Sequence, residues 1–360
     1  MSTRTPPGTV PYGMGGHPHH GGGKASGKVP PSMTWEPGKD FWRHRKVAVT
    51  GGTGFLGSHV VSQLCTLGAD VLVVVRDDIP LGPVHERWWS AVTRARGDIC
   101  DQQAMERVLG ESEVQTVIHL AAQTQVGVAN LNPISSFESN VRGTWTVLEA
   151  IRRSPSVQQV VVASSDKAYG TQPELPYTET MPLSAVHPYD VSKAAGDMIA
   201  TSYARTYGVK VAITRCGNLY GPGDTNWERL FPGVIRQLLE GQRPVIRSDG
   251  TLTRDYLYVE DAASCYLLLA ETLASHPHLA GEAFNFASGR PLSVLEVVAL
   301  VQAAVGTSLE PDVRATASGE IFHQYLSAEK ARAVLGWQPA HTFEEGLERT
   351  VAWYRAVLGT

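Results

Sequence analysis

The chain has few cysteines, no long hydrophobic run and no excess of charge of one sign. Its four cysteines among 360 residues, Cys65, Cys100, Cys216 and Cys265, stand far apart and form no C-x-x-C pair. This spacing predicts neither a zinc site nor a disulfide framework, so we expect no bound metal and a reduced, cytoplasmic protein. No apolar run approaches the ~18 residues that a transmembrane helix needs, and we expect no membrane insertion.

The charges are nearly balanced. There are 31 Lys and Arg against 35 Asp and Glu, a formal net charge of −4, and no segment forms a basic stripe. This balance argues against a sequence-independent nucleic-acid binder. Hydrophobic residues make up 42% of the chain, enough for a sizeable core, which excludes disorder throughout. The length fits two or three domains, or one α/β domain with a smaller lobe.

Residues 1–43 differ in composition from the rest. They are rich in Gly, Pro and His and contain no apolar core of a secretory signal. Such a segment buries too little apolar area to offset the entropy of ordering it, so we expect a disordered tail without a chemical role.

Apolar runs then alternate with helix-length segments. Five β-branched runs predict strands: Val47–Thr50, Val71–Val75, Val117–Leu120, Val160–Ala163 and Val211–Thr214. Amphipathic segments between them predict helices: Ser58–Leu67, Gln102–Leu109, Thr144–Arg152 and Ser192–Tyr207. This alternation is typical of a parallel sheet covered on both faces. We predict an α/β fold with a Rossmann-like, doubly wound parallel sheet over residues 44–216.

The alternation of predicted strands and helices ends after residue 216. Residues 217–259 are rich in Gly, Pro, Arg and Trp, and four later segments predict helices: Asp261–Leu273, Ser293–Val305, Ser327–Leu335 and Thr342–Leu358. We predict a smaller mixed α/β lobe over residues 217–360, interleaved with the end of the sheet.

A glycine-rich turn follows the first predicted strand. Gly51 permits a tight turn, Gly54 lets the backbone approach a pyrophosphate, and Gly57 allows close packing of helix on strand. Free N–H groups at the start of the next helix favour a phosphate. This strand–turn–helix context predicts a dinucleotide site, with glycines spaced three and three rather than two and three. The expected cofactor-binding residues are Gly51, Gly54, Phe55, Leu56 and Gly57.

The ends of later strands supply the rest of this site. A carboxylate at the tip of the second strand binds the 2′-hydroxyl of NAD, whereas an arginine suits the 2′-phosphate of NADP. The chain has both, Arg76 and then Asp77; Arg76 lies nearer the tip, which favours NADP, and NAD stays open. Asp98 could reach the adenine or cap the helix that follows. The other expected cofactor-binding residues are Ile99, Leu120, Ala121 and Ala122.

Tyr189 and Lys193 stand four residues apart at the start of a predicted helix, so they share a face. A tyrosine with an ordinary pKa of ~10 is a poor base at neutral pH. An ammonium one turn away and a positive nicotinamide ring would stabilise the phenolate and lower that pKa. Together with the glycine turn, this pair predicts a hydride-transfer site, and both residues are expected to contact the cofactor.

The motifs together resemble the extended short-chain dehydrogenase/reductases of the NAD-dependent epimerase/dehydratase group, which act on nucleotide-diphospho-sugars. The resemblance covers residues 46–358. It implies a Rossmann domain that holds NAD or NADP tightly, a lobe that binds the nucleotide sugar, and hydride removal from sugar C4 followed by hydride return. It rests on the glycine turn, His119–Ala122, Asn140, the serine-ending strand, Tyr189, Lys193 and Arg254–Asp261.

The resemblance also implies a homodimer. In this family two helices pair with their copies in a four-helix bundle, and Val141–Arg152 and Tyr189–Tyr203 carry apolar residues at the matching spacing. A packed core explains the same pattern equally well.

One tripeptide, Ser165-Asp166-Lys167, bears on the reaction. Family epimerases have no charged pair after the serine, whereas 4,6-dehydratases carry an acid followed by Glu or Lys; this tripeptide most resembles the CDP-glucose 4,6-dehydratases. Once C4 is a ketone, elimination of the C6 hydroxyl needs a base at C5 and an acid at C6. We expect Lys167 to be the base, Asp166 the acid and Ser165 a partner of the C4 oxygen. The alternative for the charged pair is an ordinary loop ion pair.

The expected nucleotide-sugar contacts follow the last predicted strand of the sheet. Arg215–Asp224 resembles the corresponding segment of CDP-glucose dehydratases, and guanidinium groups match phosphate oxygens. Where those enzymes typically have Arg-Pro-Trp, this chain has Arg254-Asp255-Tyr256, so the nucleotide stays open. The expected substrate-binding residues are Asn218, Arg229, Arg254 and Glu320.

These features predict an NDP-hexose 4,6-dehydratase that forms an NDP-4-keto-6-deoxyhexose. Two alternatives remain. The first is an NDP-sugar 4-epimerase of the UDP-glucose or UDP-glucuronate type. The second is a non-catalytic sensor that binds NAD(P).

Overall fold

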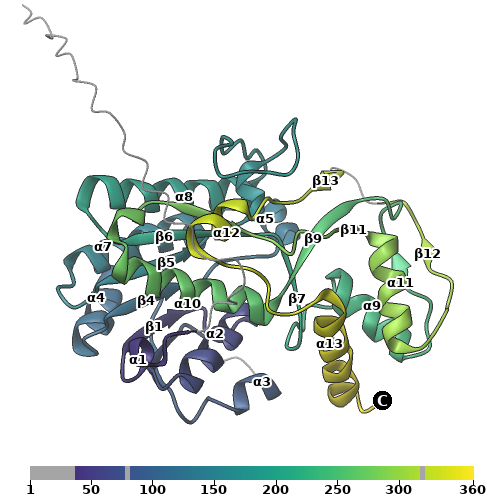
Figure 1. Ribbon diagram of the computed structural model, residues 1–360, viewed down its shortest axis with the longest axis horizontal. Helices are drawn as coiled ribbons and strands as arrows, with labels where there is room; N and C mark the ends of the chain where they lie inside the picture. The colour runs from purple at the N-terminus through teal and green to yellow at the C-terminus, as the bar shows by residue number, and fades with distance from the viewer. Residues whose placement is uncertain (1–36, 78–81, 317–320) are drawn as a thin grey trace, which may run out of the picture. The chain divides into compact units, whose positions relative to one another are not determined.

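The computed structural model describes residues 37–77, 82–316 and 321–360 (Figure 1). Its main element is a seven-stranded parallel sheet with the order β10-β6-β5-β4-β1-β2-β3. This confirms the predicted Rossmann-like sheet. The strands are β1 (Lys46–Thr50), β2 (Asp70–Val75), β3 (Thr93–Arg96), β4 (Thr116–His119), β5 (Gln159–Ala163), β6 (Val211–Cys216) and β10 (Ala283–Phe286).

Helices cover both faces of this sheet. One face packs against α2 (Phe55–Thr66) and α10 (Val259–Ser275), and the other against α4 (Gln102–Glu111), α7 (Gly143–Arg153) and α8 (Pro188–Tyr207). Strand β1 shows why. Its Val47 and Val49 lie in the first core and Ala48 lies in the second, because successive side chains of a strand point to opposite faces. A strand with a continuous run of apolar residues therefore contributes side chains to both cores.

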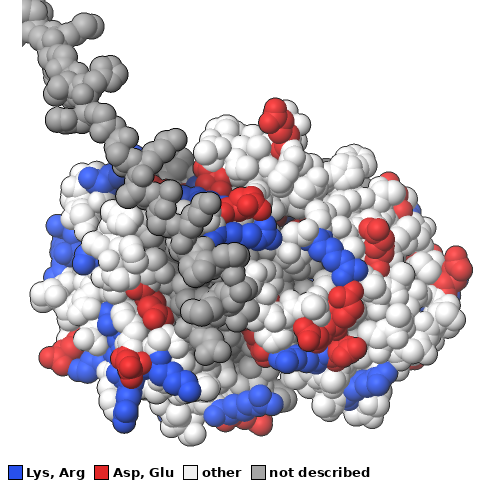
Figure 2. Space-filling model, viewed as in Figure 1, with Lys and Arg blue, Asp and Glu red and all other residues white. Residues whose placement is uncertain are grey.

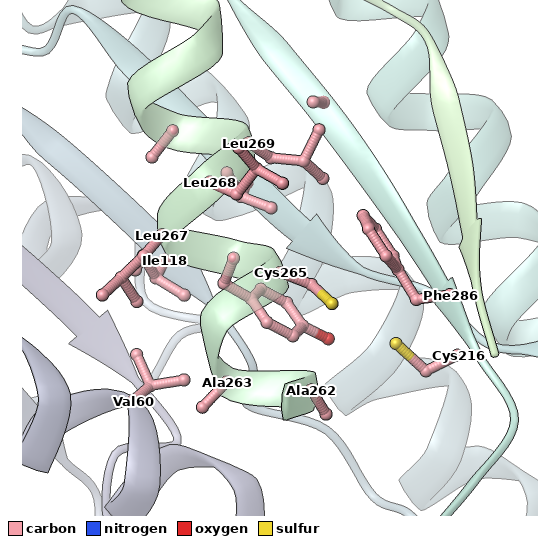
Figure 3. Packing of buried hydrophobic residues seen from close by; sticks show 14 of the residues in the cluster. Val60, Ile118, Cys216, Ala262, Ala263, Cys265, Leu267, Leu268, Leu269 and Phe286 are labelled. Carbon is pink, nitrogen blue, oxygen red and sulfur yellow. The ribbon is translucent and has the colours of Figure 1, made fainter. Parts of the chain in front are cut away.

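The contact of α10 with the sheet is drawn in Figure 3. Cys265 and Leu268 on α10 and Phe286 and Cys216 on the sheet are buried in the same hydrophobic cluster. Short elements connect the main ones: α3 (Pro83–Glu86), α5 (Val126–Leu131), α6 (Pro133–Phe137), a π-helix η1 (Glu138–Arg142), the 3-10 helices η2 (Asp166–Tyr169) and η3 (Pro277–Leu279), and α12 (Glu329–Leu335).

A second sheet forms the core of the C-terminal lobe. It contains β7 (Asn218–Tyr220), β9 (Thr253–Tyr258), β11 (Pro291–Ser293) and β13 (His323–Gln324), and a separate pair joins β8 (Val245–Ile246) to β12 (Asp312–Val313). Three helices cover it: α9 (Leu230–Leu239), α11 (Val294–Val305) and α13 (Phe343–Leu358). Aromatic rings fill this core; those of Tyr220 and Phe231 stack 4.6 Å apart.

Some elements differ from the sequence prediction. Residues Lys39–Trp42, which we expected within a disordered tail, form the short helix α1 because Trp42 is fully buried in the first core. Residues 1–36 of that tail lie outside the described residues. Strands β3 and β10 and helix α9 were not predicted.

Two surface properties agree with the composition. On the face drawn in Figure 2, Lys and Arg side chains lie among Asp and Glu without a broad patch of one sign. Within the described ranges, no helix is both long and apolar enough to cross a membrane.

Candidate active site

A cavity of about 880 Å³ lies at the carboxyl ends of the main-sheet strands and reaches into the C-terminal lobe. Ligands of open α/β sheets bind at this edge. The structure brings most of the predicted site residues to its wall: Gly51, Gly54, Phe55, Leu56, Gly57, Arg76, Ile99, Leu120, Ala121, Ala122, Ser165, Asp166, Lys167, Tyr189, Lys193, Asn218 and Arg229.

The glycine turn has the shape that a pyrophosphate requires. Gly51 has a φ of +71°, and a Cβ there would lie 2.7 Å from the backbone nitrogen of Ala121. A Cβ on Gly57 would lie 2.0 Å from the carbonyl oxygen of Gly51, so only glycine lets α2 begin this close to β1. The N-cap Gly54 provides no side-chain acceptor and the first turn of α2 holds no acidic residue. The N–H groups there therefore suit an anionic ligand.

At the far end of this site, Arg76 and Asp77 both line the cavity and pair with each other, Nε to Oδ2, at 2.6 Å. Because both groups line the cavity, they do not distinguish NAD from NADP. Asp98 is not among the described residues that line the cavity; its Oδ1 accepts the backbone N–H of Cys100 at 2.9 Å. The alternative, that Asp98 caps α4, is wrong, because Asp101 is the N-cap and accepts from the N–H of Ala104.

Tyr189 and Lys193 share one face of α8 beside the cavity, and both are buried. Lys193 Nζ donates to the carbonyl oxygen of Ala163 at the end of β5, at 3.0 Å. Burial lowers the pKa of Lys193 to about 8. Burial also raises the pKa of Tyr189, reinforced by the charge of Asp166 and opposed by Ser165 and Arg229. The lowered pKa that we expected for Tyr189 is therefore not present in the protein alone.

The side chain of Asn140, which lies in the π-helix η1, makes three hydrogen bonds. Its Nδ2 donates to Ser192 Oγ at 2.8 Å and to the carbonyl of Gln123 at 3.0 Å, while its Oδ1 accepts the N–H of Gln123 at 2.7 Å. One buried amide therefore joins the loop after β4 to the start of α8. The wider turn of η1 directs this side chain inward, as π-bulges frequently do at functional sites.

Asp166 and Lys167 form the first turn of η2, directly after Ser165. Ser165 Oγ donates to Asp166 Oδ1 at 2.9 Å and accepts the backbone N–H of Lys167 at 3.2 Å. Asp166 is buried and Lys167 is half-buried. No ion pair joins these two described residues; Lys167 Nζ instead donates to Gln324 Oε1. The alternative of an ordinary loop ion pair is therefore wrong.

At the end next to the C-terminal lobe, the cavity is lined by Asn218 after β6 and by Arg229 at the start of α9. Arg229 Nη1 donates to Asp224 Oδ2 at 3.1 Å. Burial raises the pKa of Asp224, against the charge of that arginine. Phe231 and Tyr256 add aromatic surface next to these charges. Sequence reasoning did not single out Asp224, Phe231 or Tyr256 as contacts, although each lies within or beside a quoted motif.

The two remaining predicted substrate contacts are Arg254 and Glu320. Arg254 is buried and not among the described residues of the cavity wall; it donates to the carbonyls of Ile321 and Phe322 at 2.7 and 3.1 Å. Glu320 lies outside the described residues.

A parallel sheet with a glycine turn, a Tyr-Lys pair and a strand-end serine defines a nucleotide-dependent enzyme of the short-chain dehydrogenase/reductase class. Residues 47–287 match the model of the NAD dependent epimerase/dehydratase family, and the chain belongs to that family.

The chain is similar to members with two different activities. It is 33% identical to a putative UDP-glucose 4-epimerase of Methanocaldococcus jannaschii, over 86% of this chain and 98% of that protein. It is also 33% identical to dTDP-glucose 4,6-dehydratase 1 of Escherichia coli, over 86% and 92%. The solved dTDP-glucose 4,6-dehydratase DesIV of Streptomyces venezuelae, with NAD and TYD bound, has a TM-score of 0.78 and 31% identity and covers 87% of this chain and 98% of its own.

Proposed function

We propose that this protein is an NDP-hexose 4,6-dehydratase that uses bound NAD. The observation that carries the proposal is the η2 turn, where Asp166 and Lys167 line the same cavity as Ser165 and Tyr189. The family match and the NAD in DesIV support NAD over the NADP that Arg76 slightly favoured. The cofactor is reduced and reoxidised within one turnover, so no external reductant is consumed.

The glycine turn and the start of α2 would hold the pyrophosphate, and the residues after β4 the nicotinamide end. Bound NAD would supply the hydride acceptor for sugar C4 and the hydride donor for C6. Tyr189, as phenolate, takes the proton of the C4 hydroxyl, and Ser165 hydrogen-bonds the same oxygen. Lys193 stabilises the phenolate from within the same helix. The C4 carbinol thus loses one hydride and one proton and becomes a ketone.

The second step belongs to η2. The C4 ketone acidifies the C5 proton, and Lys167 removes it. Asp166 gives a proton to the C6 hydroxyl, so that the C6–O bond breaks and water leaves. The C5=C6 double bond that results takes up the hydride at C6 and a proton at C5. The product is an NDP-4-keto-6-deoxyhexose, lighter than the substrate by one water.

The similarity to an epimerase over 98% of that protein's length keeps a 4-epimerase as the second candidate. Incubation of the holoenzyme with dTDP-, UDP- and CDP-glucose, followed by mass spectrometry, separates the two. A dehydratase releases water and its product is 18 Da lighter, whereas an epimerase yields an isomer of unchanged mass. A product of unchanged mass with every sugar would refute the dehydratase, and binding of NAD(P) without any turnover would leave the sensor.

We also infer a homodimer through α7 and α8. Helix α8 packs against α7, α5 and α6, and Trp145 on α7 (44%), Met198 on α8 (63%) and Leu131 on α5 (90%) are exposed. Large apolar side chains grouped in this way mark an interface. Met198→Glu should shift the sedimentation coefficient from dimer to monomer, while Val357→Glu on the remote α13 should not. A wild-type monomer would exclude the dimer.

A further inference from the structure

Gln324 on β13 contacts both members of the η2 pair from outside the cavity. Its side chain is buried. Its Nε2 donates to the carbonyl oxygen of Asp166 at 3.2 Å, and its Oε1 accepts from Lys167 Nζ. Gln324 is not among the described residues of the cavity wall, whereas Asp166 and Lys167 are. The glutamine therefore supports the pair from the C-terminal lobe without reaching the substrate.

Only one orientation of this amide satisfies both contacts. An ammonium group can only donate hydrogen bonds and a peptide carbonyl can only accept them. The amide oxygen must therefore face Lys167 and the amide nitrogen must face Asp166. A glutamate of the same shape would place a carboxylate oxygen against the Asp166 carbonyl, so the neutral amide is a chemical requirement of the arrangement.

The neutrality of this acceptor matters for Lys167. Among the described carboxylates near the lysine, Asp166 on the same turn accepts from Ser165. On α8, burial raises the pKa of Asp190 and the charge of Lys167 lowers it to a lesser extent. A general base must be unprotonated before it can accept a proton. A carboxylate acceptor beside the lysine would stabilise its protonated form. The side chain that β13 brings to Lys167 instead carries no charge.

Gln324 is placed by the substrate-binding lobe. It stands in register with Arg254 on the parallel strand β9. Arg254 in turn donates to the carbonyls of Ile321 and Phe322, directly before β13. The position of Lys167 therefore depends on a strand that is held by Arg254. Gln324, on that strand, lies 158 residues from Asp166 along the chain.

We propose that Gln324 is a positioning residue for the elimination step: its neutral amide holds the amine of Lys167 at the cavity wall in a form that can accept the C5 proton. This inference rests on the proposed dehydratase function for its catalytic meaning. The contact that it describes can be tested without turnover.

The first test measures the reactivity of Lys167 with acetic anhydride, which modifies only the neutral amine, by mass spectrometry of the holoenzyme at pH 8. The exposed Lys210 serves as internal reference. In Gln324→Glu, Lys167 labelling should fall about tenfold, the effect of raising a pKa by one unit. In Gln324→Met it should rise, because the ammonium loses an acceptor. The control Gln159→Met changes an equally buried glutamine at the start of β5, the end of that strand away from η2. It should leave Lys167 labelling unchanged. Unchanged Lys167 labelling in both Gln324 variants would overturn the proposal.

The second test measures the two chemical steps separately with dTDP-glucose and UDP-glucose in D₂O. Gln324→Glu should slow incorporation of deuterium at C5 about 10- to 100-fold, with cofactor reduction and KM changed less than twofold. An equal loss of both steps would mean a merely structural role and would overturn the proposal. If labelling changes as expected but the wild type incorporates no deuterium from either sugar, the dehydratase function fails and the positioning of Lys167 stands.

Discussion

The proposed hydride-transfer group, Tyr189 and Lys193, and the proposed elimination pair, Asp166 and Lys167, are built in different ways, although they line one cavity. Tyr189 and Lys193 are neighbours on one helix, and Lys193 bonds to the end of β5 in the same sheet domain. Asp166 and Lys167 occupy a short turn that is held by Gln324 of the C-terminal lobe. The first group is therefore specified locally, and the second only when both parts of the chain are folded together.

This difference suggests how one scaffold can serve two reactions. An epimerase and a dehydratase both need hydride transfer at C4, so both can keep the helix-borne pair. Elimination additionally needs an acid and a base, which in our proposal are residues that Gln324 of the C-terminal lobe contacts. A change of reaction would thus need changes at η2 and β13 and none in α8.

The largest effect is expected at the shared group. Tyr189→Phe should lower cofactor reduction by an NDP-hexose by roughly 10³–10⁴-fold, because it removes the group proposed to take the C4 proton. Reduction is followed by absorbance at 340 nm after mixing. Tyr203→Phe, on the same helix and far from the cavity wall, is the control. Reduction at the wild-type rate in Tyr189→Phe would show that the phenol is not the base.

Lys167→Met should separate the two groups. We expect deuterium incorporation at C5 to fall roughly 10²–10⁴-fold, the usual range for loss of a general base, while cofactor reduction stays within about twofold. The exposed Lys210→Met serves as a charge-matched control. If cofactor reduction falls as much as deuterium incorporation, Lys167 and the Tyr189–Lys193 pair do not act in separate steps.

A stability prediction concerns the support beneath η2. Tyr169 Oη donates to Asn285 Oδ1 and accepts from Arg215 Nη1, both at 2.8 Å, and Arg215 is paired with Asp197 of α8. Tyr169→Phe would leave two buried groups without this partner and should lower the free energy of unfolding by about 1–3 kcal/mol in urea titrations. Tyr177→Phe, equally buried but with one long hydrogen bond of 3.4 Å, should cost less. The reverse order would contradict the assigned network.

The smallest effect is a pH dependence within the locally specified half. His119 at the end of β4 is buried between Thr50 and Thr144, and burial lowers its pKa from 6.5 to about 3. Between these values the unfolded chain binds a proton that the folded chain does not, so stability falls as the pH is lowered. The wild type should lose about 2 kcal/mol more between pH 7 and pH 5 than His119→Gln does. Equal losses would mean that His119 is protonated in the folded protein.

The sequence predicted the parts of the molecule whose signals are local. The glycine turn and the Tyr189–Lys193 pair could be found because each lies within one short segment. Strand β3, in which three of the four residues are exposed and none is buried, carries no apolar pattern. Helix α1 could not be found because only the distant core explains the burial of Trp42. Gln324 belongs to no sequence motif that indicates a function. Its hydrogen bonds to Asp166 and Lys167 are seen only in the structure, where β13 lies beside η2.

The order of the strands has a consequence for any attempt to cut the protein in two. Strand β10, residues 283–286, pairs with β6, and α10 covers α2, so the chain returns from the lobe to complete the sheet. A fragment ending at residue 216 would present β6 as an unprotected edge and expose the apolar surface that α10 covers. We expect such a truncated product to precipitate on expression, and only the uncut polypeptide to be recovered from the supernatant.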